Sequence, residues 1–138
     1  MAEDRRPMAR SIDMMINCPF SEAYAFTKQP ENFALWAAGM ASSLHFEDDA
    51  WHAKTPAGDA VVTFSPPNAF GILDHRVDIA GKAEIYIPLR MIKNGDVTHV
   101  VFTLLRQPGM DDAAFEEDAK AVEKDLLALK ALLERKPD

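Results

Sequence analysis

The order of apolar and polar positions divides this chain into a run of strands closed by one long helix. From residue 10 to residue 106 apolar residues mostly alternate with polar ones, whereas from 111 to 134 they recur every three or four positions. Alternation is typical of a strand with one buried face, and the wider spacing is typical of an amphipathic helix. The pattern predicts a strand at 11–17, short helices at 19–27 and 31–37, six further strands, and a helix at 111–134.

Hairpin registers can be predicted by requiring that apolar faces coincide, because a slip of one residue inverts every side chain. The predicted turns lie at residues 48–49, 56–59, 81–83 and 94–95. Across the first turn, Phe46 is predicted to pair with Trp51 and His45 with His52, and across the second, Trp51 with Phe64 and Ala53 with Val62. Across the third turn, Val77 is predicted to pair with Ile87 and His75 with Leu89. Across the fourth, Leu89 is predicted to pair with Val100 and Ile87 with Phe102. The resulting inner face is apolar around His75.

These elements predict an α+β fold class in which one helix is too narrow for its sheet. About seven strands at about 4.8 Å spacing make a sheet roughly 30 Å wide, whereas a helix is about 10–12 Å across. The curved antiparallel sheet must therefore wrap around the long C-terminal helix, and we expect a cavity between them. With two short helices after the first strand, this is a helix-grip fold.

Length and composition indicate a single domain. Of the 138 residues, 1–9 are expected to form a flexible tail and 10–138 one domain. A net charge of −7 argues against a nucleic-acid partner, and no apolar stretch reaches the roughly 20 residues of a membrane span. The single cysteine, Cys18, fits a small core residue in a cytoplasmic, reducing compartment.

His75 is the candidate with the clearest chemistry, because it lies in the middle of the predicted inner face. An inward imidazole can orient a carbonyl or phenol, or act as general acid or base. The alternative is a core histidine that is hydrogen-bonded to a neighbour. His45 and His52 lack a third ligand in the local pattern, so we expect no metal site and no cofactor.

The predicted ligand-binding residues are those that the register places around the cavity. They are Trp36, Phe46, Trp51, Phe64, Leu73, His75, Ile87, Leu89, Phe102, Arg106 and Phe115. Arg106 either pairs with a ligand carboxylate at the cavity mouth or caps the last helix through Asp111 or Asp112. Arg90 and Asp74 are expected to form an ion pair on the outer face. Apolar residues on that face suggest a homodimer: Ile92, Val97, Val101 and Leu105.

Several segments resemble the START-like superfamily known as SRPBCC, which includes polyketide cyclases and uncharacterised bacterial members. They are Asn17-Cys18-Pro19 with Glu22-Ala23-Tyr24-Ala25-Phe26, Pro30-Glu31-Asn32 through Trp36, Gly71-Ile72-Leu73-Asp74-His75, Pro88-Leu89-Arg90, and Phe102-Thr103-Leu104 through Pro108-Gly109-Met110. The resemblance covers residues 10–134 and implies a domain that binds hydrophobic small molecules. No catalytic signature of the cyclases carries over to a residue of this chain.

Three functional hypotheses follow. The first is binding of a lipid-like or aromatic, polyketide-like molecule between the sheet and the C-terminal helix. The second is a cyclase or dehydratase that uses His75 as acid or base. The third is an interaction module, similar to the related domain that activates a chaperone, with no open cavity.

Overall fold

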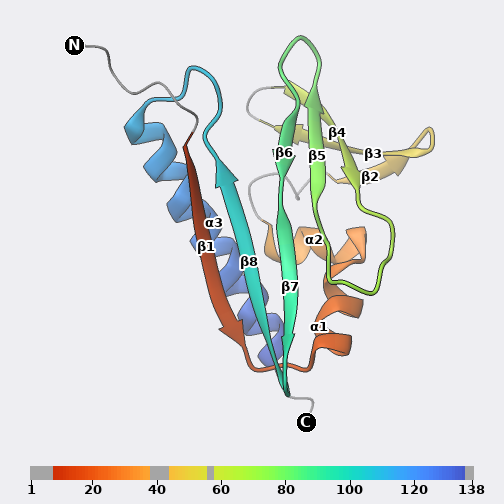
Figure 1. Ribbon diagram of the computed structural model, residues 1–138. Helices are drawn as coiled ribbons and strands as arrows, with labels where there is room; N and C mark the ends of the chain where they lie inside the picture. The colour runs from red at the N-terminus through yellow and green to blue at the C-terminus, as the bar shows by residue number, and fades with distance from the viewer. Residues whose placement is uncertain (1–7, 38–43, 56–57, 136–138) are drawn as a thin grey trace.

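The computed structural model describes residues 8–37, 44–55 and 58–135. The elements follow the predicted order: β1 (Ala9–Ile16), α1 (Phe20–Thr27), α2 (Pro30–Trp36), β2 (His45–Glu47), β3 (Ala50–Thr55), β4 (Gly58–Phe64), β5 (His75–Ile79), β6 (Ile85–Ile87), β7 (Leu89–Asn94), β8 (Val97–Leu105) and α3 (Asp112–Glu134) (Figure 1). The α+β class and the long C-terminal helix are therefore confirmed.

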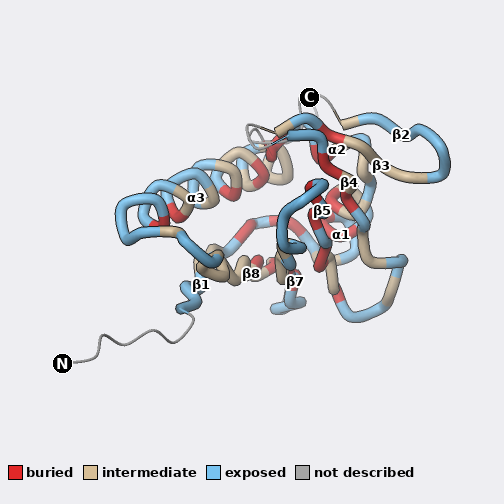
Figure 2. The backbone as a smooth tube through the Cα atoms, turned by 90° about the horizontal axis from the view of Figure 1, so that it is seen from above, coloured by how far each residue is buried: buried red, intermediate tan, exposed pale blue. Residues whose placement is uncertain are grey.

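The strands form two antiparallel sheets instead of the single sheet that was predicted. Within the described residues, β1, β8 and β7 make a three-stranded sheet, and β2 to β6 make a five-stranded sheet in sequence order. Helix α3 lies along one face of the three-stranded sheet, where α1 contacts β7 and β8, and α2 packs against α3 (Figures 1 and 2). The count of eight strands differs slightly from the predicted seven.

The division between the sheets falls at Pro88, which separates β6 from β7 and has no N–H to give to a ladder. The segment that contains β5 nevertheless pairs in one register with the residues on both sides of Pro88. His75 pairs with Ile87 before the break, and Ile72 bridges Arg90 after it. The two sheets are thus one curved surface with a local interruption.

The core lies between α3 and the inner face of β1, β8 and β7. Within α3 the predicted apolar stripe is buried at Phe115, Ala119, Leu126 and Leu129, and Figure 2 shows this buried side of the helix turned toward the sheet. In β1 the buried side chain is Ile16, with Ile12 and Met14 half-buried on the same face. A fully buried Ile, Leu or Phe side chain contributes about 1.5–3 kcal/mol. Cys18 is buried and free, as predicted.

The first hairpin has the predicted register, but the other three predicted registers are wrong by two residues. A slip of two keeps every side chain on its own face, so the requirement of coincident apolar faces does not detect it. The observed partners are Trp51 with Val62, Ala53 with Ala60, Val77 with Ile85, His75 with Ile87, Met91 with Val100, and Leu89 with Phe102.

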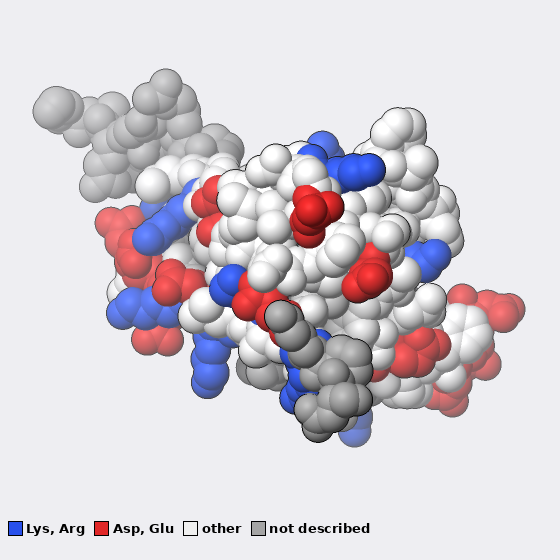
Figure 3. Space-filling view, turned by 90° about the horizontal axis from the view of Figure 1, so that it is seen from below, with Lys and Arg blue, Asp and Glu red and all other residues white. Residues whose placement is uncertain are grey.

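The surface carries both signs of charge. In the view from below, Lys and Arg side chains are interspersed with Asp and Glu (Figure 3). On the outer face of the three-stranded sheet Ile92 is 53% exposed, and a homodimer through this face stays a prediction. Among the helices in the described part of the chain, none is both long and apolar enough to cross a membrane.

Candidate functional site

Two neighbouring cavities lie on the inner side of the curved sheet, against α2. The larger measures about 100 Å³ and the smaller about 20 Å³. The larger is lined by Phe33, Trp36, Ala37, His75, Ile87, Phe102, Val122, Asp125 and Leu126. These residues come from α2 and its C-cap Ala37, from β5, β6 and β8, and from α3, so α2 contributes Phe33 to the wall beside the predicted Trp36. Phe33, Trp36 and His75 line both cavities.

His75, the first residue of β5, is buried with 4% of its surface exposed. Its Nδ1 lies 3.1 Å from the carbonyl oxygen of Leu73. A carbonyl only accepts, so Nδ1 carries the proton and Nε2 is left as an acceptor. Burial lowers the pKa of His75, although the Leu73 carbonyl and the nearby Asp74 charge oppose the shift. The ring is therefore neutral at pH 7, with an acceptor nitrogen beside the cavities.

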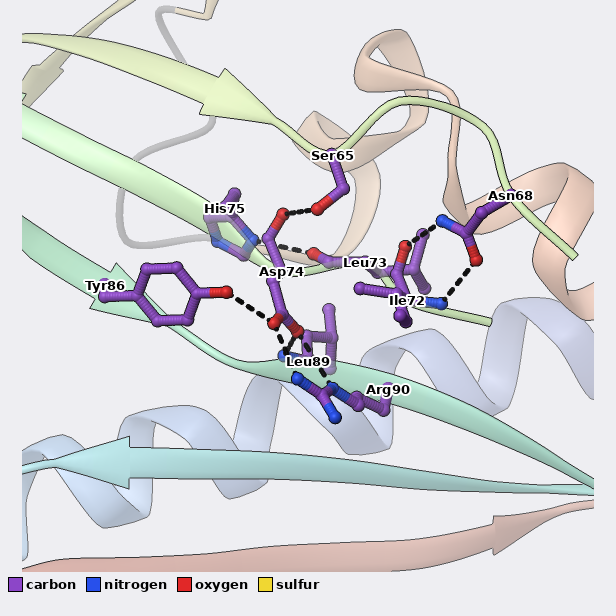
Figure 4. A network of polar contacts seen from close by, with 9 residues as sticks. All are labelled: Ser65, Asn68, Ile72, Leu73, Asp74, His75, Tyr86, Leu89 and Arg90. Carbon is purple, nitrogen blue, oxygen red and sulfur yellow. Dashed lines mark hydrogen bonds and ion pairs between the residues drawn. The ribbon is translucent and has the colours of Figure 1, made fainter. Parts of the chain in front are cut away.

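The carboxylate of Asp74 does not assist His75, because it points to the opposite side of the strand. It accepts hydrogen bonds from Tyr86 Oη at 2.6 Å, Leu89 N at 2.9 Å, and Arg90 Nη2 at 2.9 Å (Figure 4). Burial acts to raise the pKa of Asp74, but these hydrogen bonds outweigh it and the pKa is lowered. The predicted ion pair exists, yet Asp74 is 4% exposed and not a surface group.

Phe33 is the aromatic centre of the site. Its ring lies edge-on to Trp36 at 5.2 Å, to His75 at 5.5 Å and to Phe64 at 5.6 Å between centroids. Edge-to-face packing of this kind holds aromatic rings in defined orientations. The indole N–H of Trp36 is buried and has no hydrogen-bond partner within the described residues.

Solved structures of similar shape confirm what the sequence resemblance predicted for the fold. An uncharacterised protein from Bacillus thuringiensis matches with a TM-score of 0.71 and 11% identity, over 91% of this chain and 98% of its own. A START superfamily protein from Mycobacterium smegmatis matches with a TM-score of 0.70 and 11% identity, over 91% and 97%. This chain has the START-like fold.

A third match is DynU16, a protein in the dynemicin biosynthetic locus. Its TM-score is 0.67 at 13% identity, over 91% of this chain and 47% of that one. The sequence matches no protein-family model and no curated protein. At these identities the likeness concerns the backbone alone.

Seven of the predicted ligand-binding residues line the cavities of this START-like fold. They are Trp36, Phe64, Leu73, His75, Ile87, Leu89 and Phe102. The others lie elsewhere. Phe46 was placed on the inner face, but it is 58% exposed because β2 is a short edge strand, and its ring packs on Trp51 at 5.3 Å. Trp51 lies edge-on to Phe64, with 6.3 Å between the ring centroids, and lines neither cavity.

Arg106 and Phe115 form a separate cluster at the start of α3. Arg106 bonds the carbonyl oxygen of Met110 at 3.0 Å and Asp112 Oδ1 at 2.8 Å, and its guanidinium lies 5.8 Å from the centre of the Phe115 ring. Of the two alternatives for Arg106, the structure shows the contact with the helix start. Neither residue lines a cavity.

Phe33 is the main residue that sequence reasoning left out of the site. Its spacing of three from Trp36 put both side chains on one face of α2, which was the available signal. Val122, Asp125 and Leu126 were also missed, because Phe115 was the one residue of α3 that was predicted to bind the ligand. His45 and His52 stack at 5.6 Å, and no group of three metal-ligating side chains occurs in the described ranges.

Proposed function

We propose that this chain binds a small, largely apolar molecule in the larger cavity, between α2, the sheet and α3. The observation that carries the proposal is the composition of the cavity wall, where apolar and aromatic side chains surround a neutral, buried His75. Sites for small molecules are usually concave and mostly apolar, with a few placed polar groups. The likeness to START-like structures supports a lipid-like or aromatic ligand.

The cavity volume limits which ligands fit without rearrangement. A cavity of about 150 Å³ holds one benzene molecule, whereas this cavity measures about 100 Å³. The cavity as it stands is therefore smaller than one that holds a benzene ring, and even a single ring requires a small movement of its walls. A ligand of several rings, or an acyl chain, requires α2 to move away from β5 and β6, since sites for such ligands measure about 300–1,000 Å³.

Toluene is a suitable first probe because it is neutral, apolar and only one methyl group larger than benzene. A ligand that binds only the folded state raises Tm in proportion to the logarithm of its concentration above Kd. We expect toluene to raise the Tm of the wild-type protein in scanning calorimetry. Val122→Phe places a ring in the larger cavity from α3 and should abolish the rise.

Leu127→Phe is the matched control, because Leu127 lies on the same helix and is 51% exposed. It should keep the wild-type response to toluene. An unchanged wild-type Tm at saturating toluene and naphthalene would refute the proposal, as would a Val122→Phe protein that responds like the wild type.

His75 favours a second candidate, an enzyme of cyclase or dehydratase type in which this residue moves a proton. Its Nδ1 is held by Leu73 and its Nε2 is an acceptor beside the cavities. Within the described ranges, however, the ring has no hydrogen bond to a carboxylate, and the oxygens of Asp74 are bonded to other groups. The third hypothesis, a module without an open cavity, has less support because the described residues line a partly open cavity of about 100 Å³.

Deuterium exchange tests this second candidate without knowledge of the substrate. A general base beside a bound ketone removes a proton from the carbon next to the carbonyl group. The wild-type protein should therefore speed exchange of the acetophenone methyl group in D₂O, followed by NMR, and His75→Gln should not. Equal rates for the two proteins would dismiss His75 as a base in this chemistry.

A further inference from the structure

The indole N–H of Trp36 is a buried donor for which the described part of the chain offers no acceptor. Trp36 is 4% exposed and lines both cavities. Buried N–H groups are paired in the great majority of cases, and an unpaired one destabilises the fold. A ligand that places an oxygen acceptor in the cavity would satisfy this donor.

His75 offers the complementary group. Its Nδ1–H is used by the Leu73 carbonyl at 3.1 Å, so Nε2 accepts. Both Trp36 and His75 pack edge-on against Phe33, at 5.2 and 5.5 Å, and both line the larger cavity. One donor and one acceptor thus belong to residues that line the same small space. Trp36 Nε1 is itself covered, so a ligand reaches this donor after a small shift of the atoms around it.

The charges around the larger cavity favour a neutral ligand. Asp125 is on its wall, and none of the described residues lining this cavity is Lys or Arg. An anionic ligand would lose its water and gain no cation in exchange, next to a carboxylate of the same sign. Carboxylates are therefore poor ligands for this cavity.

We infer that the larger cavity selects a neutral cyclic molecule that bears both a carbonyl oxygen and a hydroxyl group. The carbonyl oxygen accepts from Trp36 Nε1–H, and the hydroxyl donates to His75 Nε2. This inference rests on the proposed function and names the chemical class of its ligand. A plain hydrocarbon fills the cavity but leaves Trp36 without a partner, and a site with unpaired polar groups discriminates against such analogues.

Four probes of similar size separate these contributions. They are 3-hydroxyacetophenone, acetophenone, 3-ethylphenol and ethylbenzene, titrated calorimetrically at pH 7. Trp36→Phe keeps an aromatic ring but removes the N–H, so it should weaken the two ketones about tenfold, the factor for one hydrogen bond. The affinity of Trp36→Phe for 3-ethylphenol and for ethylbenzene should stay within about twofold of the wild-type affinity. His75→Phe should weaken the two hydroxyl-bearing probes instead.

Trp51→Phe is the matched control, because it makes the same substitution at a tryptophan outside both cavities. It should bind all four probes like the wild type. A second measurement needs no variant in the cavity. In wild-type protein, the indole ¹H–¹⁵N resonance of Trp36, assigned as the one that remains in Trp51→Phe, should shift downfield with either ketone and not with ethylbenzene.

The outcomes separate this inference from the function on which it rests. Suppose that ethylbenzene binds, that Trp36→Phe leaves the affinities for the ketones unchanged, and that the indole resonance does not shift with them. These results would overturn the inference and leave the proposed function standing. If none of the four probes binds, both are overturned.

Discussion

Arg90 donates two hydrogen bonds to the buried carboxylate of Asp74, from Nε at 3.3 Å and from Nη2 at 2.9 Å. Asp74 stands opposite the break at Pro88, and its other partners are Tyr86 in β6 and the backbone N–H of Leu89 in β7. One carboxylate thus binds residues on both sides of the interruption. We conclude that the Asp74 carboxylate joins the two sheets at Pro88, where the backbone hydrogen-bond ladder is interrupted.

Replacing Asp74 should therefore destabilise the fold strongly. Asp74→Ala leaves the Leu89 N–H without its buried acceptor and removes charge-assisted hydrogen bonds, which together cost roughly 2–4 kcal/mol. Urea denaturation at pH 7 would measure this loss. Asp78→Ala, at an exposed position of β5, the strand that follows Asp74, should change the free energy of unfolding by less than about 0.5 kcal/mol. Equal effects would contradict the joining role.

The contribution of Asp74 should also depend on pH in a defined direction. The pKa of Asp74 is lowered in the folded protein, where hydrogen bonds from Arg90, Tyr86 and Leu89 outweigh burial. Its stabilisation is therefore complete above the unfolded value of about 3.9 and is lost as pH falls through the folded pKa. The stability difference between wild type and Asp74→Ala should narrow below about pH 4. A constant difference would refute this.

His75 should make the fold less stable in mild acid. Burial lowers its pKa. Below about pH 6.5, His75 therefore becomes protonated in the unfolded chain while it stays neutral in the folded protein. The free energy of unfolding should fall as pH drops from about 6.5 toward the folded pKa, by up to about 1.4 kcal/mol per pH unit. His75→Phe should flatten this slope in urea titrations, whereas His52→Phe should retain it. A slope that survives in His75→Phe would contradict the neutral, buried ring.

Gly71 should be intolerant of any side chain. It has φ +74°, and an added Cβ would overlap the Met91 carbonyl oxygen and lie 2.9 Å from Phe20 Cε1. Gly81 has a similar φ of +78° but open space around it. Gly81→Ala should cost about 1–2 kcal/mol from backbone strain alone, and Gly71→Ala at least about 2 kcal/mol more from overlap. Thermal and urea unfolding would compare the pair, and equal losses would show that the crowding is absent.

The sequence predicted the elements and their faces well because these depend on local periodicity. The β1 face with Ile12 and Ile16 and the α3 stripe with Leu126 were both recoverable from spacing. Absolute register was not recoverable, since a slip of two residues preserves the faces. At the last hairpin, Asn94 pairs with Val97, so the turn begins at Gly95 and not at Asn94. The positive φ of Gly95 fits that shift.

The site was predicted in part, for a related reason. Trp36, His75 and Phe102 were placed at the cavity by the alternation of the strands and by the face of α2. Burial of Asp74 was missed, because it depends on the interruption at Pro88 and on three donors from separate positions. The tertiary position of α2, which makes Phe33 central, likewise does not follow from any local pattern.

Methyl resonances offer the most direct test of the central claim, that a ligand occupies the space between α2, the sheet and α3. Protein with ¹³C-labelled Ile, Leu and Val methyl groups would be titrated with toluene. We predict that the resonances of Ile87, Val122 and Leu126, which line this cavity, shift together and show contacts to the toluene protons. Shifts confined to exposed residues such as Leu35, Ile92 and Leu127, or no shifts at all, would contradict the account.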